Sequence, residues 1–208
     1  MDFPDFFSKA PTVTVHDPLA AFLGASASGV ITYCYADAVK LAGHSCPTVA
    51  GAYLMVCKGL ARLYGDALPE RGGIEVHMRD PRDEGTAGVV AAIATLLTGA
   101  ASETGFGGIG ADRHFARRDL LRFDTPIHGP MALRRRDTGM GVVLDLDTSR
   151  VPPDAAMRTL LPKVASRSAD EEEQARFAAL WQDRVARMLL DHADDPEFVR
   201  TMEWQAAA

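Results

Sequence analysis

The stretch Gly-His-Ser-Cys-Pro-Thr-Val-Ala-Gly-Ala-Tyr, residues 43–53, predicts where the central helix of the fold begins. Gly43 suits the end of a preceding helix, and Pro47 suits the first position of the next one, where a missing N–H is harmless. Gly65 then marks the end of the second helix. Between these limits, apolar residues recur at helical spacing: Val49, Ala52, Tyr53, Val56, Leu60 and Leu63. We therefore expect a long helix with one apolar face.

The same stretch places a histidine and a cysteine two residues apart at the start of this helix. Cys46 falls at or beside the N-cap, where free backbone N–H groups and the positive helix end stabilise an anion. A thiolate there is a good nucleophile or metal ligand, which makes Cys46 the candidate catalytic residue. His44 lies close enough to share a metal with Cys46 or to take its proton. The turn is therefore a candidate metal site or reactive-thiol site.

The remaining patterns predict an α+β fold, with a mixed or antiparallel sheet packed with helices and a helical C-terminal extension. Asp17-Pro18 opens a short helix, and Ile74 to Met78 alternates as a strand does. Met131–Arg136 and Val142–Asp147, joined by Asp-Thr-Gly-Met-Gly, predict a β-hairpin. Three parts follow from these patterns and from a change of composition beyond Pro152: an N-terminal arm (1–12), a core (13–150) and a helical extension (151–208).

Composition restricts the class of protein. The 208 residues are 47% hydrophobic and carry a net charge of −6, which argues against nucleic acid as the main partner. No apolar run is long enough to span a bilayer, so no membrane partner is expected. The acidic N-terminus lacks the features of a signal peptide, and three cysteines make no disulfide framework. We expect a cytoplasmic protein with reduced thiols.

The block from Asp37 to Pro47 resembles the signature of the formylmethanofuran dehydrogenase E-subunit (FmdE) family, which carries a Gly-His-x-Cys-Pro motif followed by an apolar helix. The resemblance continues through Leu-Tyr-Gly-Asp at 63–66, Pro-Glu-Arg-Gly-Gly at 69–73 and the glycine-rich segment 98–110. It covers residues 13–147. The resemblance implies an α+β domain that often dimerises and a metal site, usually zinc, near the His-x-Cys motif. It implies no securely established reaction.

Two departures from the family pattern bear on the metal. Many members carry a further histidine two residues before the first, where this chain has Ala42. Many also carry a C-terminal zinc ribbon with paired Cys-x-x-Cys units, and this sequence contains no Cys-x-x-Cys. The ribbon zinc is therefore excluded, and any metal must be held in the core.

Four residues are the predicted ligands of a zinc ion, or of a related transition metal such as nickel or iron. They are His44, Cys46, His16 and His77. His16 stands just ahead of another proline-started helix, and Asp17 beside it is placed to orient its imidazole. Three further histidines rank lower because two fall in predicted loops and one in the acidic tail: His114, His128 and His192.

Other residues admit less specific interpretations. Cys34 is expected to be a small buried hydrophobe. Gly105 to Gly110 matches G-x-G-x-x-G but lacks the strand-before, helix-after context of a dinucleotide fold, so we exclude NAD. Arg113, Arg117 and Arg118 either bind an anionic ligand or form a solvated, salt-bridged face, and the second interpretation is favoured. The run Arg134–Arg136 is expected to be an exposed strand end.

Three classes of function remain open. The first is a metalloenzyme that acts on a small molecule, and the second is a metal-binding or delivery protein that serves a redox enzyme. The third is a metal-free enzyme in which His44 activates Cys46. We expect a homodimer, because the family and the apolar N-terminal arm both favour one. A small-molecule ligand is the other expected partner.

Overall fold

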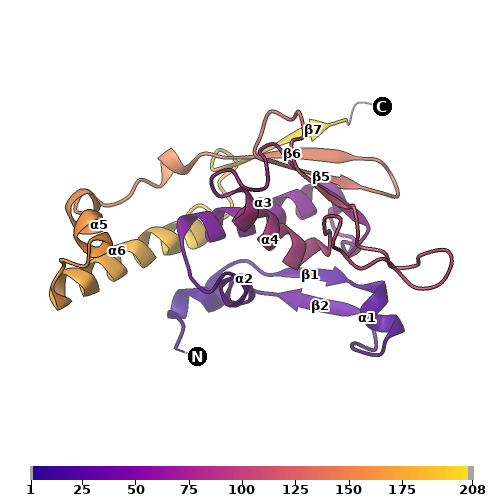
Figure 1. Cartoon of the computed structure of the whole chain (residues 1–208), viewed down its shortest axis with the longest axis horizontal. Coiled ribbons are helices and arrows are strands. Elements are labelled where there is room, and N and C mark those ends of the chain that lie inside the picture. Colours follow the sequence, from indigo (N-terminus) through magenta and orange to yellow (C-terminus); the bar gives the residue numbers. More distant parts are fainter. Residues whose placement is uncertain (1, 206–208) are drawn as a thin grey trace.

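The computed structural model describes residues 2–205 and confirms the predicted α+β fold. The described chain forms six α-helices and two sheets (Figure 1). The helices are α1 (Pro18–Phe22), α2 (Tyr35–Ala42), α3 (Pro47–Tyr64), α4 (Ala87–Thr98), α5 (Met157–Ala165) and α6 (Glu171–Leu190), with short 3-10 helices η1 (Asp5–Lys9) and η2 (Thr148–Arg150). The strands are β1 (Val13–His16), β2 (Val30–Tyr33), β3 (Ile74–Met78), β4 (Leu121–Arg122), β5 (Met131–Arg135), β6 (Gly141–Leu146) and β7 (Val199–Trp204).

The larger sheet is mixed and has the strand order β4-β3-β5-β6-β7. Only the β3–β4 pair is parallel, and the predicted hairpin is confirmed as β5 and β6, with Met131 opposite Leu144. The smaller sheet pairs β1 with β2 in antiparallel fashion.

Helix α3 forms the centre of the core. One side of it packs against β5, β6 and β7, and α4 packs beside it against β3. Gly51 and Gly59 face this sheet so closely that an added Cβ would lie 2.3 Å from a Leu146 methyl and 2.6 Å from a Leu133 methyl. The β1–β2 ribbon joins the core through Tyr53, whose hydroxyl donates to the Pro11 carbonyl oxygen at 2.7 Å.

The predicted boundaries of the central helix are confirmed. Cys46 is the N-cap of α3, Pro47 is its first residue, and Gly65 is its C-cap. Gly43 ends α2 in the left-handed conformation, with φ at 75°, which glycine adopts without steric cost. Cys34 differs from the expectation, because it is a half-buried N-cap of α2 whose thiol donates to Asp37 Oδ2 at 3.3 Å.

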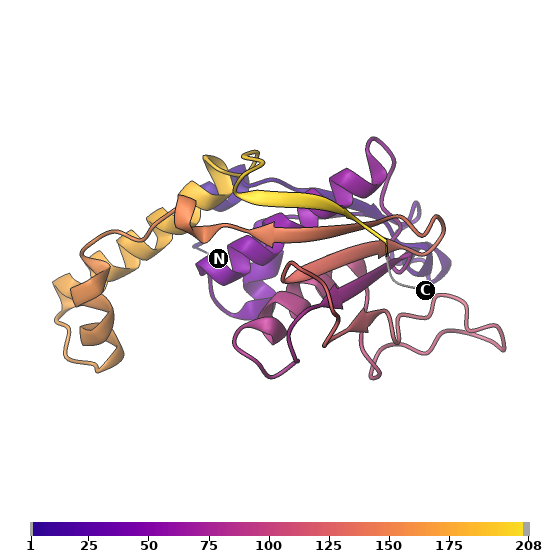
Figure 2. The same cartoon turned by 90° about the horizontal axis from the view of Figure 1, so that it is seen from above.

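The C-terminal part begins as a helical arm that projects from the body (Figure 2). The far end of α6 nevertheless belongs to the core, because Val185, Met188 and Leu189 are fully buried and α6 packs on α3. The chain then returns to the sheet as β7, which pairs with β6. The sequence did not predict this strand, so the segment after residue 150 combines a helical arm with an edge of the main sheet.

The N-terminal arm packs on the chain's own core rather than standing free. Phe7 is buried, and its ring meets that of Tyr35 edge to face with centroids 4.9 Å apart. No helix within residues 2–205 has the length and hydropathy needed to cross a bilayer.

Candidate functional site

His44 lies exposed in the turn between α2 and α3. Its Nδ1 is 2.9 Å from the Ala42 carbonyl oxygen, an acceptor, so the hydrogen bond assigns the proton to Nδ1. The Nε2 lone pair is then left available. This is the usual arrangement of a metal-bound histidine, in which one ring nitrogen is anchored to a carbonyl while the other binds.

Cys46 adjoins this imidazole in sequence but is buried, with 9% of its surface exposed. Its Sγ accepts a hydrogen bond from the Val49 backbone N–H at 3.4 Å, so the thiol itself caps the helix. Within residues 2–205, no hydrogen bond joins Cys46 to His44. The two groups therefore share a turn without forming a thiol–imidazole pair.

The residue between them is held by the C-terminal helix. Ser45 Oγ donates to Gln182 Oε1 at 2.9 Å and lies 3.0 Å from the Tyr35 hydroxyl. The Trp181 indole N–H donates to the Ser45 carbonyl oxygen at 3.1 Å, and Gln182 adds a second donor at 3.2 Å. Burial raises the pKa of Tyr35, so its hydroxyl stays protonated and is available as a donor to Ser45. Helix α6 thus fixes the His-x-Cys turn from far along the chain.

The other two predicted ligands lie elsewhere in the fold. His16 ends β1, where its N–H donates to the Pro69 carbonyl oxygen at 2.9 Å and its own carbonyl accepts from Arg71 N at 2.8 Å. His77 is on β3, 5% exposed, with its ring 4.8 Å from that of Trp204. In the described chain, no three His, Cys, Asp or Glu side chains are grouped so as to hold a metal ion. One chain therefore offers two of the predicted ligands at one turn, and the metal assignment stays a prediction.

Asp17 has a different partner from the one expected. It caps α1 through the Leu19 and Ala20 N–H groups, as predicted, but its oxygens bind Arg71 at 2.8 Å and Arg117 at 2.7 Å. Burial by itself raises the pKa of Asp17, but the two arginines together hold it below its ordinary value. Asp17 is therefore an anchor for two guanidinium groups.

The arginines, too, depart from the favoured interpretation. Arg117 is buried rather than solvated, and Arg135 is half-buried, with its guanidinium 4.1 Å above the Tyr64 ring. The sequence signal for Arg117 was present, in the glycines that precede it, but nothing local indicated where its side chain would lie. Residues 105–110 form part of an irregular loop after α4.

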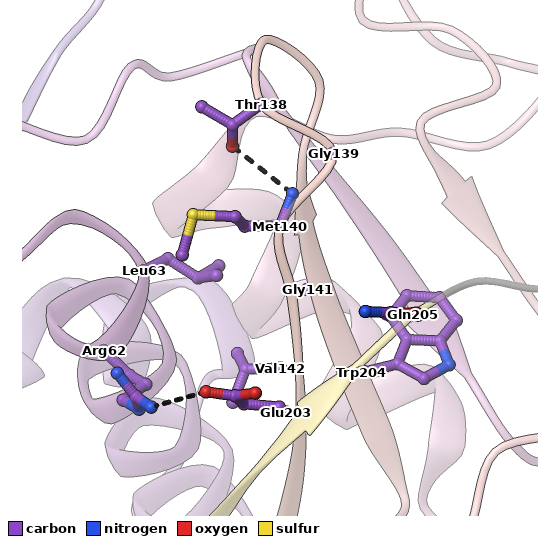
Figure 3. A pocket seen from close by; sticks show the side chains of 10 residues that line it. All are labelled: Arg62, Leu63, Thr138, Gly139, Met140, Gly141, Val142, Glu203, Trp204 and Gln205. Carbon is purple, nitrogen blue, oxygen red and sulfur yellow. Dashed lines mark hydrogen bonds and ion pairs between the residues drawn. The ribbon is translucent and has the colours of Figure 1, made fainter.

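An open cavity of about 340 Å³ lies between the end of α3, the β5–β6 turn and β7 (Figure 3). Its polar wall is closed by an ion pair between Arg62 and Glu203 at 3.2 Å, and Trp204 forms another side. None of the candidate ligands lines this cavity.

No family model matches the chain, and no curated protein matches it. A solved structure, a tungsten formylmethanofuran dehydrogenase FmdE-like protein from Syntrophus aciditrophicus, is similar in fold. The two share 15% sequence identity over 84% of this chain and 74% of the other, with a TM-score of 0.45. At this level only the folds are alike, so the function of this chain is inferred from its own residues.

Proposed function

We propose that the protein binds a transition metal, zinc or else nickel or iron, through His44 and Cys46, and passes it to a redox enzyme. The observation that carries this proposal is the hydrogen bond from His44 Nδ1 to the Ala42 carbonyl. It leaves Nε2 free on an exposed ring, at the turn where a thiol stands on a helix N-terminus.

The donor set fits a metal that is held only in part by one chain. Zinc prefers four nitrogen, sulfur or oxygen ligands, and the turn supplies one nitrogen and one sulfur. The remaining positions fall to water, to a receiving protein or to a second copy of the chain. A homodimer that brought two such turns together would supply two histidines and two cysteines. Open positions on an exposed site favour ligand exchange, which suits a delivery protein better than a metalloenzyme.

The geometry favours metal binding over a metal-free thiol enzyme. An activated cysteine needs a base within hydrogen-bond reach and a third group that orients the base. His44 is oriented by Ala42, but it makes no hydrogen bond with the Cys46 thiol among the described residues.

Zinc titration against a competing chromophoric chelator tests the proposal. We expect His44→Ala and Cys46→Ser each to weaken binding by at least about 100-fold, more than the loss of an outer hydrogen-bond partner. Cys34→Ser is the matched control, because Cys34 is also a helix N-cap, and His128→Ala controls for loss of an exposed imidazole. Both controls should bind zinc as the wild type does.

The same titration distinguishes a dimeric site. One zinc per two chains, with dimerisation that requires zinc in size-exclusion chromatography with light scattering, would show that two turns share the ion. Unchanged zinc affinity in both site variants would contradict the proposal. Selective alkylation of Cys46 that His44→Ala slows would then support the thiol enzyme.

A further inference from the structure

A second polar cavity, of about 320 Å³, lies beside the start of α1 and is bounded by the turn before β3 and by the loop after α4. Its charged lining is strongly one-sided: four arginines face a single glutamate, Glu70. The arginines are Arg71, Arg113, Arg117 and Arg136. In a chain whose net charge is −6, such a concentration of guanidinium groups around one cavity needs an explanation.

Arg117 is the least expected of these groups, because it is only 6% exposed. Its Nη2 donates to Asp17, but its Nε and Nη1 have no hydrogen-bond partner within residues 2–205. A buried donor left without an acceptor is unfavourable and rare in folded proteins, and an unaccounted ligand or ion is a common reason for one.

The backbone is shaped to admit this guanidinium. A Cβ added at Gly72 would lie 1.6 Å from Arg117 Nη1, and one at Gly99 would lie 3.0 Å from the same atom. Gly72 also has a φ of +91°, which other residues rarely adopt. Two glycines from separate turns therefore make the space that Arg117 occupies.

The positive charge of the cavity is only partly balanced. Asp17 binds both Arg71 and Arg117, whereas Arg113 and Arg136 form no ion pair within the described part of the chain. Glu70 is likewise without an ion-pair partner there and offsets one charge. Counting Asp17 and Glu70 against the four arginines leaves two positive charges.

We propose that this cavity binds a compact anionic group, a carboxylate or a phosphate, of a small molecule. The anion's oxygens accept the hydrogen bonds that Arg117 does not make within the chain, and the planar guanidinium fork suits either group. Arg113 and Arg136 contribute the uncompensated charge. The volume is at the lower end for small-molecule sites, which fits a metabolite-sized ligand.

The site is separate from the His44 and Cys46 turn. The cavity includes Pro18 at the start of α1, whereas the candidate metal ligands lie between α2 and α3 (Figure 1). These two places lie at opposite ends of the β1–β2 ribbon in that view. Anion binding and metal binding therefore fail or succeed independently.

Calorimetric titration of the full chain with inorganic phosphate and with succinate, at ionic strength held constant with chloride, tests this proposal. We expect saturable binding of at least one probe, and the stronger probe identifies the class of anion. Arg113→Gln and Arg136→Gln should each weaken it about ten-fold, the effect of one charge-assisted contact. Glu70→Gln should strengthen it several-fold, because it removes the repelling carboxylate.

Arg118→Gln is the matched control. It removes the same charge from the same loop, but Arg118 is exposed, donates to the Gly105 carbonyl and does not line the cavity. Binding equal to that of the wild type in this control, with losses in the Arg113 and Arg136 variants, would support a built site. Equal losses in all three variants, or no saturable binding of either probe, would overturn the proposal and leave Arg117 as a packing element.

Discussion

At the residue scale, His77 is a histidine held in an apolar setting. It lies on the face of the large sheet that is opposite α3, against Trp204. Burial lowers the pKa of His77, although Glu75 acts in the opposite direction, and the charges of Arg122 and Arg134 lower it further. The folded protein therefore favours the neutral imidazole.

This predicts a component of acid sensitivity that belongs to one residue. Because the pKa of His77 is lower in the folded chain than its ordinary value of 6.5, the unfolded chain binds a proton more readily. The contribution is present above pH 6.5 and is lost as the pH falls through the folded pKa. Urea unfolding at pH 7.5 and pH 5.5 should show a smaller acid-induced loss for His77→Phe than for the wild type. The same loss in both proteins would contradict this assignment.

Residue-scale chemistry could be predicted from the sequence where it depends on near neighbours. The caps at Asp17 and Cys46 follow from the proline after each and from the N–H groups two or three residues on. The partners of Asp17 could not be predicted, because Arg71 is 54 residues away and Arg117 is 100 residues away. The same separation hid the cavity that these arginines line.

At the element scale, the contact between α3 and the sheet depends on the absence of a side chain at Gly59. A Cβ there would lie 2.6 Å from a Leu133 methyl and 2.9 Å from a Leu144 methyl, and both leucines are fully buried. Alanine is ordinarily better than glycine within a helix by about 1 kcal/mol. Here overpacking, at about 1–3 kcal/mol, should exceed that gain.

We therefore expect Gly59→Ala to lower the free energy of unfolding by as much as about 2 kcal/mol, measured by chemical denaturation. Ala61→Gly, at an exposed position of the same helix, is the reference and should lose about 1 kcal/mol through helix propensity alone. An increase in stability for Gly59→Ala would show that the two leucines can move apart.

Elements with a strong internal period could be predicted, whereas β7 could not. Helix α3 shows a clear apolar face, and β3 alternates along Ile-Glu-Val-His-Met. The segment Val-Arg-Thr-Met-Glu-Trp has only one apolar residue on the core side, Val199, because this strand lies at the sheet edge. Its pairing with β6 comes from backbone hydrogen bonds, which leave no mark on the side-chain pattern.

At the scale of the whole molecule, the chain after residue 150 is not a removable unit. Strand β7 completes the sheet, α6 packs on α3, and Trp181 holds the Ser45 turn. The outer part of the arm is different, because α5 and the first half of α6 project away from the body (Figure 2). Arg184 and Arg187 bind the carbonyl oxygens of Val151 and Pro152, so the two stems of the arm lie side by side.

Two deletions should therefore behave oppositely. Ending the chain at residue 150 removes the buried side chains of α6 and exposes the β6 edge, so we expect an aggregating product without a cooperative unfolding transition. Replacing residues 153–176 by a short Gly-Ser linker leaves both stems, Trp181 and β7 in place. This second protein should unfold cooperatively and keep the zinc affinity of the wild type, because the turn that carries His44 and Cys46 is still fixed by α6. Circular dichroism during thermal unfolding, followed by the chelator titration, checks both points. A cooperative fold for residues 1–150 would show that the core is complete without its C-terminal strand, and loss of zinc from the linker variant alone would place a ligand in the arm.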